Sequence, residues 1–333
     1  MNNSVCIIFG GTGFIGSHFA QFLISHHLAD KIILADLAPP RTCFNFDKNL
    51  VQYVKLDVRQ PIDSPDIPQS ANLIVNLAAI HREPGHEPYE YFETNLLGAE
   101  HVCAWADKIG CKQLIFTSSI APYGATESIK TEQSIPVPIS AYGGSKLAAE
   151  KIHIGWQKAE PGKKLVIVRP GVVFGPGEGG NVTRLIQAVI HHYFFYMGNR
   201  KTHKAGGYVK ELINSLFWAL ERTPVKGGVF LYNFSMQHPP TVEEYVKTTC
   251  KVAGIKRFVA TMPYPFLLAI SHLIEAVASF LSVKQPISPV RIRKLVRSNN
   301  IKPEILRQLN YQYLYSLESA MRDWKKERPD EWN

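Results

Sequence analysis

The sequence has few cysteines, and no spacing pairs them. Only 5 of the 333 residues are cysteine, the number is odd, and no Cys-x-x-Cys pair occurs. A disulfide framework or a zinc site built on paired thiolates would need such spacings. The neighbouring histidines His26-His27 and His191-His192 have side chains that diverge, so we predict no metal site. We therefore expect a reduced, cytoplasmic setting.

The sequence also lacks a hydrophobic run long enough to cross a bilayer. Its most apolar stretch, residues 263–283, is interrupted by Glu275, whereas a membrane-spanning helix needs about 20 apolar residues. The first residues carry no basic group, and Val5–Phe9 is too short for the core of a secretion signal. With 45% hydrophobic and 20% charged residues, and without repeats, the composition is typical of a globular protein with a large core.

The formal net charge is +9, and the excess lies in the second half of the chain. Residues 171–333 hold 22 basic and 12 acidic residues, whereas residues 1–170 hold 15 and 16. This asymmetry is compatible with a phosphate-bearing ligand, nucleic acid, an anionic membrane or an ordinary basic surface. No recognisable nucleic-acid motif accompanies the charge, so we do not expect nucleic acid as a partner.

Short apolar runs alternate with segments of helical periodicity through the first half. The runs that predict buried strands are Val5–Phe9, Lys31–Ala35, Val51–Leu56, Leu73–Leu77, Gln113–Phe116 and Leu165–Val168. The segments that predict helices are Phe14–Leu28, Tyr91–Ile109 and Ala141–Ala159. This alternation predicts an α/β fold, a Rossmann-type doubly wound parallel sheet. We expect a nucleotide-binding domain over residues 1–170 and a smaller, mostly helical substrate-binding region over 171–333, parts of which return to the sheet.

A glycine cluster follows the first predicted strand. In Gly10-x-x-Gly13-x-x-Gly16 the glycines permit a tight turn, the close approach of a pyrophosphate and close packing of a helix on the sheet. The helix that follows presents free amides and its positive dipole end to phosphates. Asp36, 20 residues after Gly16, ends the next strand, where a carboxylate accepts hydrogen bonds from ribose hydroxyls. The pattern favours NAD over NADP, and the nearby Arg41 leaves NADP open.

A tyrosine and a lysine lie four residues apart on a predicted helix. Tyr142 and Lys146 therefore share one helix face, and a neighbouring ammonium lowers the pKa of a phenol. This predicts Tyr142 as a general base near neutral pH, with Lys146 also able to reach ribose hydroxyls. Ser119 follows a strand end, where doubly wound folds place ligand contacts, and its hydroxyl can hold the reacting oxygen.

These features together resemble the extended short-chain dehydrogenase/reductases of the NAD-dependent epimerase/dehydratase group, over essentially the whole chain. Further matching segments are Asp57-Val58, Asn76–Ala79, Asn95, Thr117–Ser119 and Arg169–Gly177. The resemblance implies NAD as cofactor and Ser119, Tyr142 and Lys146 as catalytic residues. The cofactor contacts that we expect are Gly10, Gly13, Phe14, Ile15, Gly16, Asp36, Asp57, Val58, Leu77, Ala78, Ala79, His81, Asn95, Tyr142, Lys146, Pro170 and Val172. The expected substrate contacts are Ser119, Asn181, Arg184 and Arg291.

Finer details are similar to bacterial C4-epimerases that act on N-acetylhexosamines linked to UDP or to undecaprenyl diphosphate. The segments concerned are Asn76–Arg82, Gly180–Val182, Pro263–Pro265 and Ser288–Lys294. A 4,6-dehydratase is not expected, because dehydratases carry an acidic residue two positions after the catalytic Ser or Thr, where this chain has Ala121. The chain departs from the wider family at Lys210, where an Asp usually follows the aromatic–Val pair.

We hypothesise an NAD-dependent C4-epimerase of a diphosphate-linked N-acetylhexosamine, acting through a 4-keto sugar in surface polysaccharide biosynthesis. The alternative is a net NAD(P)-dependent oxidoreductase of hydroxysteroid-dehydrogenase or keto-sugar-reductase type. Residues 266–281, followed by Arg291, Arg293, Lys294 and Arg297, fit either a helix at the inner membrane surface or a buried helix that closes the substrate region. We also expect a homodimer, because relatives often dimerise through the helix that carries the tyrosine.

Overall fold

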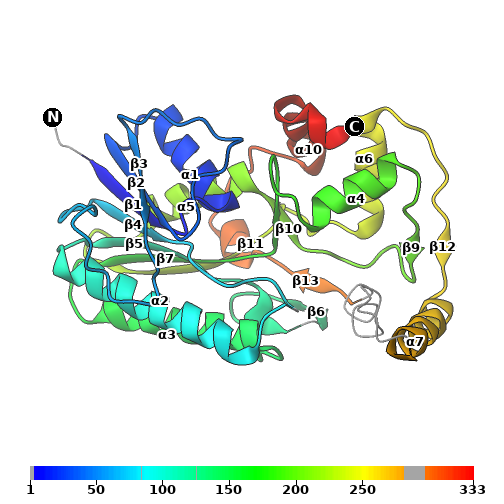
Figure 1. The fold of residues 1–333 in the computed structure, drawn as a ribbon, viewed down its shortest axis with the longest axis horizontal. Coiled ribbons are helices and arrows are strands. Elements are labelled where there is room, and N and C mark those ends of the chain that lie inside the picture. The colour runs from blue at the N-terminus through cyan, green and yellow to red at the C-terminus, as the bar shows by residue number, and fades with distance from the viewer. Residues whose placement is uncertain (1–3, 84, 125, 281–296) are drawn as a thin grey trace.

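Seven parallel strands form one sheet in the computed structural model of the chain, which describes residues 4–83, 85–124, 126–280 and 297–333 (Figure 1). The strand order is β11-β7-β5-β4-β1-β2-β3. The strands are β1 Val5–Phe9, β2 Lys31–Asp36, β3 Val51–Lys55, β4 Leu73–Asn76, β5 Gln113–Thr117, β7 Lys164–Pro170 and β11 Gly228–Phe234. The order changes direction between β1 and β4, so the carboxyl ends of these strands form the crevice where such sheets bind ligands. The doubly wound parallel sheet is confirmed.

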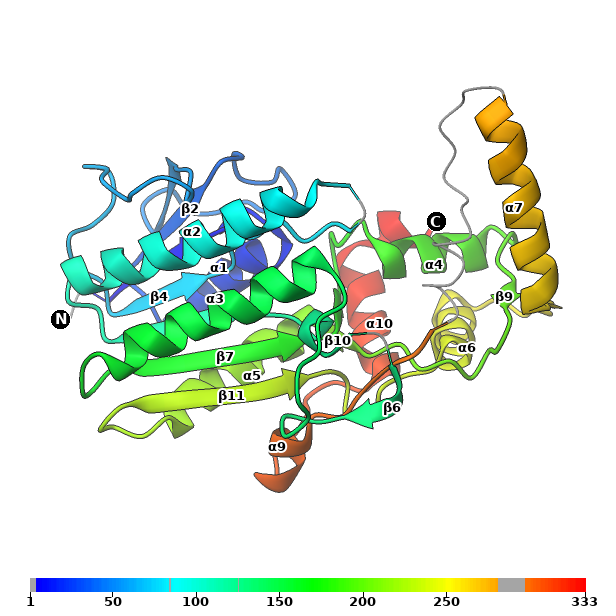
Figure 2. The ribbon, with the colours of Figure 1, turned by 90° about the horizontal axis from the view of Figure 1, so that it is seen from below.

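Helices cover both faces of this sheet (Figure 2). α1 (Phe14–Ser25) and α5 (Val209–Arg222) cover one face, and α2 (Pro88–Lys108) and α3 (Ala141–Lys158) cover the other. Strand β1 serves both layers, because Cys6 and Ile8 pack into the core beneath α1 while Ile7 and Phe9 pack into the core beneath α2 and α3. Burial on both faces explains why the strands are continuous apolar runs.

Local capping sets where the helices of the sheet layers begin. α2 begins at Pro88, three residues before its apolar pattern, because Glu87 and Glu90 form a reciprocal capping box and proline suits the first helical position. α3 begins at Ala141, where the Ser140 hydroxyl accepts the Gly143 amide at 3.2 Å. The second cap fixes the orientation of the helix that carries Tyr142.

The chain after Pro170 contributes to the sheet as well as to a region beyond its carboxyl ends (Figure 1). β11 pairs with β7 along its whole length, and α5 packs on the same strand. One core joins the two parts, since the same buried cluster contains Ile8 of β1, Val168 of β7 and Trp324 of α10. The elements outside the large sheet are η1 Ala121–Tyr123, β6 Thr126–Lys130, β8 Val172–Phe174, α4 Asn181–Ile190, β9 Tyr196–Met197, β10 Gly206–Tyr208, α6 Val242–Ala253, β12 Thr261–Met262, α7 Tyr264–Phe280, β13 Asn299–Ile301, α9 Glu304–Gln308, α10 Leu317–Glu327 and η2 Pro329–Trp332.

Three small two-stranded sheets connect these outer elements, pairing β8 with β10, β9 with β12 and β6 with β13. The expected apolar helix exists as α7, which has 17 residues. Across the described part of the chain, no helix combines the length and the apolar character that crossing a membrane requires.

Candidate cofactor and catalytic site

The loop between β1 and α1 is shaped by glycines that leave no room for a side chain. Gly10 has φ +73°, and a Cβ there would lie 2.7 Å from the Ala78 nitrogen. A Cβ on Gly16 would lie 2.6 Å from the Gly11 oxygen, so this residue lets α1 pack on the loop. Gly13, which caps α1, has only the Gly10 oxygen near its Cβ position, at 3.2 Å.

The start of α1 suits a pyrophosphate group. Its first turn, which begins with Phe14 and Ile15, contains no acidic residue, and no side chain caps it. The first amides of a helix have no partner within the helix, and the dipole there favours an anion. These features fit the pyrophosphate of NAD, as expected from the sequence.

Asp36 ends β2 beside the glycine loop. Its Oδ2 accepts the Thr12 amide at 3.2 Å, and the Thr12 hydroxyl donates to the Ala38 oxygen at 3.0 Å. The carboxylate thus sits next to the loop, where it fits a ribose diol. Arg41, the residue that left NADP open, lies beside the loop after β8. Its Nη1 atom is 3.8 Å from the place that a Cβ on Gly177 would take.

The loop after β4 carries Leu77, Ala78 and Ala79, and it is fixed to both neighbouring elements. The Leu77 amide donates to the Phe9 oxygen at 2.8 Å. Asn95, which is buried in α2, accepts the Ile80 amide at 3.0 Å and donates to the Ser145 hydroxyl on α3 at 2.8 Å. Asn95 therefore supports the expected cofactor loop from behind.

Other expected cofactor residues lie along the same edge of the sheet. Asp57, after β3, accepts both Nε and Nη2 of Arg59, at 3.0 and 2.7 Å, and these hydrogen bonds lower the pKa of its carboxyl group. Val58 is buried, and His81 is exposed. Pro170, the last residue of β7, accepts the Ile120 amide at 3.1 Å, and Val172 begins β8.

The three expected catalytic residues lie near the end of β5 and the start of α3. Tyr142 lies in the first turn of α3, is half-buried and forms a hydrogen bond with Ser119. The Ser119 hydroxyl also accepts the Ala121 amide at 3.1 Å, which holds it in place after β5. Lys146, one turn further along α3, is 2% exposed, and its Nζ lies 4.3 Å from the centroid of the Phe116 ring.

Burial is the largest influence on the pKa values of this cluster. Burial raises the pKa of Tyr142, and the hydrogen bond with Ser119 opposes this rise. Burial also lowers the pKa of Lys146 to about 7, against the opposing charge of Glu150. Desolvation is therefore the largest influence on both pKa values, and the expected lowering of the Tyr142 pKa by Lys146 stays a prediction.

A buried ion pair next to Lys146 was not expected from the sequence. Glu150 and Arg169 are joined by two hydrogen bonds, Nε to Oε1 at 2.8 Å and Nη2 to Oε2 at 2.6 Å. The hydroxyl of Ser118, the neighbour of Ser119, donates to Glu150 Oε1 at 2.5 Å. Glu150 follows Lys146 by one helical turn, and that i+4 spacing could have pointed to Glu150 but not to its pairing with Arg169.

The network continues from Arg169 into the second half of the chain. Arg169 Nη1 donates to the Tyr123 hydroxyl at 2.7 Å, and that hydroxyl donates to Asn233 Oδ1 in β11 at 2.9 Å. The backbone amide of Asn233 in turn donates to Glu132 Oε1 at 2.9 Å. This series of hydrogen bonds therefore links Glu150, one helical turn from Lys146 on α3, to Asn233 in β11 and to Glu132.

The expected substrate residues are only partly described. Asn181 and Arg184 are exposed at the start of α4, where Arg184 Nη2 donates to Asn181 Oδ1 at 2.9 Å. Glu178 Oε2 accepts the Thr183 amide at 3.0 Å, so a carboxylate lies at the same helix end as these two expected substrate contacts. Arg291 lies outside the described residues, as do Arg293 and Lys294.

The unusual Lys210 has acidic partners on α10. Its Nζ lies 2.7 Å from Asp323 Oδ2 and 2.6 Å from Glu327 Oε2, and the Tyr208 hydroxyl donates to the same Asp323 oxygen at 2.5 Å. The basic residue at this position is therefore matched by acids from the C-terminal helix, and it anchors that helix to α5.

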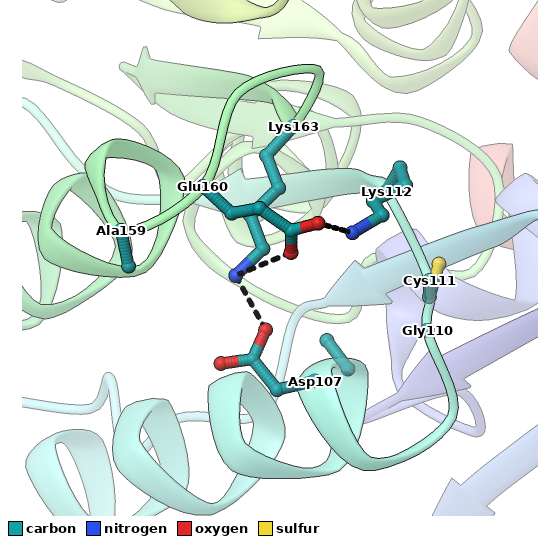
Figure 3. Close-up of a pocket in the computed structure, with 8 residues that line it drawn as sticks. Asp107, Gly110, Cys111, Lys112, Ala159, Glu160 and Lys163 are labelled. Atoms are coloured by element: carbon teal, nitrogen blue, oxygen red, sulfur yellow. Dashed lines mark hydrogen bonds and ion pairs between the residues drawn. The ribbon is translucent and has the colours of Figure 1, made fainter.

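A cavity of about 280 Å³ lies at the opposite, amino edge of the sheet (Figure 3). Lys163 Nζ lies there 2.5 Å from Asp107 Oδ1 and 3.9 Å from Glu160 Oε2, and Lys112 pairs with Glu160. The residues that line the cavity are Ala106, Asp107, Gly110, Cys111, Lys112, Ala159, Glu160 and Lys163. None of these is an expected site residue.

The fold and the carboxyl edge define a dinucleotide-binding enzyme of the short-chain dehydrogenase/reductase type. The chain belongs to the NAD dependent epimerase/dehydratase family, whose sequence pattern matches residues 6–231. NAD is accordingly its cofactor, in agreement with the glycine loop and Asp36. Nucleotide-sugar epimerases of this fold have been solved with NAD bound, among them the UDP-glucuronic acid 4-epimerase of Bacillus cereus, which has a TM-score of 0.72 and 19% identity over 99% of this chain and 100% of the other.

Relatives at the sequence level include two different activities. The chain is 26% identical over 295 residues to the N-acetyl-α-D-glucosaminyl-diphospho-ditrans,octacis-undecaprenol 4-epimerase of Escherichia coli O157:H7, covering 88% of this chain and 86% of the relative. It is 27% identical over 348 residues to a decarboxylating sterol-4-alpha-carboxylate 3-dehydrogenase of Candida albicans, covering 96% and 97%. The UDP-N-acetylglucosamine 4-epimerase of Methanobrevibacter ruminantium shares the fold, with a TM-score of 0.74 at 18% identity and 99% coverage of both chains.

Proposed function

We propose that the protein is an NAD-dependent C4-epimerase of an N-acetylhexosamine linked through diphosphate to a carrier, in surface polysaccharide biosynthesis. The observation that carries the proposal is the meeting of Ser119, Tyr142 and Lys146 beside a glycine loop that fits NAD. The family membership and the similarity to the undecaprenol-linked sugar 4-epimerase support it.

The proposed roles follow from the contacts of each side chain. Tyr142, as phenolate, takes the proton of the sugar 4-hydroxyl and later returns it, while the Ser119 hydroxyl, already hydrogen-bonded to Tyr142, holds the same oxygen. Lys146 is buried one turn away, where its charge stabilises the phenolate and its ammonium binds the ribose. When bound, NAD supplies a ring that accepts and returns a hydride and whose positive charge favours a nearby anion.

The protein's own residues must also bring the pKa of Tyr142 down as the site fills. Burial raises that pKa in the structure, so the basic form requires positive charge close to the phenol. Lys146 is the cation that α3 places one helical turn away, and the pKa of about 7 makes its charge sensitive to neighbouring groups near neutral pH. The proposed activity should therefore depend on the charges that surround Lys146.

The remaining parts of the proposal concern the chain as a whole. Residues 1–170 form the cofactor-binding and catalytic domain, and residues 171–333 bind substrate while β11 and α5 complete the sheet layers. Asn181 and Arg184 contact the diphosphate together with Arg291. The protein acts as a homodimer in the cytoplasm, with peripheral contact to the inner face of the membrane.

The test of the epimerase is incubation of the purified chain with UDP-linked and, separately, undecaprenyl-diphosphate-linked N-acetylglucosamine, followed by separation of the C4 epimers. We expect conversion of at least one substrate without net change of absorbance at 340 nm. Tyr142→Phe should lower turnover by about 10²–10⁴-fold while leaving NAD binding intact. A Tyr142→Phe protein that keeps full activity would falsify the proposed role of the tyrosine.

The second candidate is a net NAD(P)-dependent oxidoreductase, favoured by the Candida albicans sterol dehydrogenase that matches nearly the whole chain. It predicts steady growth of 340 nm absorbance with excess NAD and a 4-carboxysterol or a hydroxysteroid, and no epimerisation of either sugar. The two candidates use the same Ser119, Tyr142 and Lys146 set, so only the substrate and the net redox change separate them.

A further inference from the structure

Two long stretches of the second half contain no acidic residue. No Asp or Glu occurs between Glu178 and Glu211, or between Glu244 and Glu275. The structure brings these stretches together, because β9 of the first pairs with β12 of the second in parallel, with Tyr196 opposite Thr261. Four basic residues of these stretches, Arg200, Lys201, Lys256 and Arg257, lie within five residues of this strand pair.

The same strand pair carries exposed aromatic side chains. Phe258 lies three residues before Thr261 and is 88% exposed, and Tyr193 lies three residues before Tyr196 and is 63% exposed. Arg257 donates to the Phe194 oxygen at 2.8 Å, which holds the two stretches together next to these rings. Phe266, 55% exposed in the first turn of α7, continues the apolar surface just beyond β12.

Exposed basic residues flank these rings. Arg200 and Lys201 follow β9, and Lys256 precedes Phe258. The nearest acid on α6, Glu243, pairs with Lys247 at 2.8 Å and lies 3.8 Å from Arg200, so one acid serves two cations. We define the membrane-facing surface as Tyr193, Arg200, Lys201, Lys256, Phe258 and Phe266.

We propose that this surface docks on an anionic lipid bilayer. Exposed aromatic rings insert at the level of the headgroups, and flanking Lys and Arg bind anionic lipid, which is the combination found on proteins that lie at membrane surfaces. The surface is at the end of the molecule farthest from the large sheet, where α7 stands clear of the body (Figure 2).

The proposal stands on these residues and not on the proposed epimerase, although it agrees with a lipid-linked substrate. It also differs from the expectation drawn from residues 291–297, most of which lie outside the described residues. The occupant that it commits to is a bilayer, because the surface combines three exposed basic side chains, two of which share the acid Glu243, with three exposed aromatic rings. A second copy of this basic surface would be repelled by it.

The experiment is flotation of the full-length protein with vesicles of phosphatidylcholine alone or mixed equally with phosphatidylglycerol, at low and high salt. We expect binding to the mixed vesicles that weakens with salt, and little binding to phosphatidylcholine alone. Phe258→Ser should weaken vesicle binding about tenfold, since a buried Phe contributes roughly one factor of ten or more. Lys256→Glu should weaken it at least fivefold and remove part of the salt dependence.

Matched controls come from the turn between α5 and β11. Val225 is 88% exposed, like Phe258, and the neighbouring Lys226 is exposed, like Lys256. Val225→Ser and Lys226→Glu should bind vesicles as the unmodified protein does. Equal binding by the Phe258→Ser and Val225→Ser proteins, or absence of binding to anionic vesicles, would overturn the proposal.

Two further measurements separate this proposal from its alternatives. Tyr142→Phe should bind vesicles normally, so a protein that binds vesicles without epimerising sugars refutes only the proposed function. Sedimentation without lipid tests whether the surface joins two copies of the chain. A dimer that Phe258→Ser converts to a monomer would assign the surface to self-association and overturn the membrane proposal.

Discussion

At each edge of the central sheet a lysine is buried against an aromatic ring, but the carboxylates near the two lysines have different partners. Lys146 at the carboxyl edge and Lys163 at the amino edge are both 2% exposed. Their Nζ atoms lie 4.3 Å from the Phe116 centroid and 4.7 Å from the Trp156 centroid, respectively. Equal burial on similar rings therefore cannot explain what distinguishes the two sites.

The difference lies in where the nearest carboxylate is directed. Asp107 accepts Lys163 Nζ directly at 2.5 Å, and Trp156 contributes its carbonyl oxygen at 3.2 Å. Glu150, the acid nearest in sequence to Lys146, is instead bound on both oxygens by Arg169. Lys146 consequently feels the charge of Glu150 without a direct ion pair, and burial lowers its pKa to about 7. The comparison indicates that Lys146 is available for chemistry because Arg169 binds the carboxylate of Glu150, and that burial alone is not the reason. We call Glu150 the diverted partner of Lys146.

The sharpest test of this comparison replaces each lysine by methionine. Lys146→Met should lower turnover by about 10²–10⁴-fold without loss of stability, because methionine fills the place of an ammonium that burial disfavours. Lys163→Met should keep turnover per folded molecule and lose about 1–2 kcal/mol of unfolding free energy, since Asp107 loses a charged donor. Steady-state kinetics and urea unfolding measure both. The contrast between the edges fails if both variants lose turnover, or if neither does.

The pH dependence of stability distinguishes the same two variants. The folded pKa of Lys146, about 7, lies below its usual 10.5, so the unfolded chain binds more protons between these values. Stability should therefore rise with pH across this range through this group. Lys146→Met should lack that contribution, which urea unfolding at pH 7 and pH 9 can detect. An identical pH slope in Lys146→Met and in the unmodified protein would contradict the lowered pKa.

The Glu150–Arg169 ion pair can be broken by replacing either residue, with opposite effects on Lys146. Glu150→Gln removes the negative charge and leaves Arg169 unbalanced, so the pKa of Lys146 falls and the basic limb of the kcat/KM profile moves to lower pH. Arg169→Gln frees Glu150 to pair with Lys146, so that limb moves to higher pH. Glu150→Gln costs about 3–5 kcal/mol of stability, because the buried Arg169 stays unpaired. Arg169→Gln costs less, because Glu150 can pair with Lys146.

The double variant Glu150→Gln, Arg169→Gln controls for folding. The double variant removes both charges of the pair, so the basic limb of its kcat/KM profile should return toward that of the unmodified protein. Most of the stability lost in the single variants should return as well. A purely structural role for the pair would lower activity in both single variants and leave the limb in place. Shifts of both single variants in the same direction would also contradict the diverted-partner explanation.

Local sequence patterns were sufficient for six of the seven strands and for the glycine loop, whereas β11 was expected only as an unspecified part of residues 171–333 that returns to the sheet. Continuous apolar runs predict strands buried on both faces, and the Gly10–Gly16 spacing predicts the loop that the structure contains. The Glu150–Arg169 pair was beyond reach, because it forms only when α3 packs against β7. The carboxylate of Glu178 at the start of α4 was also missed, since its pairing with the Thr183 amide depends on the fold of an irregular glycine-rich loop.

The pKa of Tyr142 shows the limit of local reasoning most clearly. The four-residue spacing from Lys146 correctly places both groups on α3, but the spacing carries no information on burial. Desolvation is a property of the packed protein, and it moves the two pKa values toward the neutral forms. Sequence therefore identified the participants, whereas their charge states required the structure.

The smallest expected effects compare one glycine from each edge. Gly10 and Gly110 have similar φ angles, +73° and +67°, so alanine is strained at both by about 1 kcal/mol. A Cβ on Gly10 would also lie 2.7 Å from the backbone nitrogen of Ala78, whereas a Cβ on Gly110 would meet nothing within 4 Å. Gly10→Ala should therefore weaken NAD binding about tenfold or more, corresponding to at least ~1.4 kcal/mol, since β1 and the loop after β4 must separate. Gly110→Ala should bind NAD normally and lose only the strain energy in urea unfolding. Equal NAD affinities in titrations of the two proteins would mean that the close approach of Gly10 to Ala78 does not shape the cofactor site.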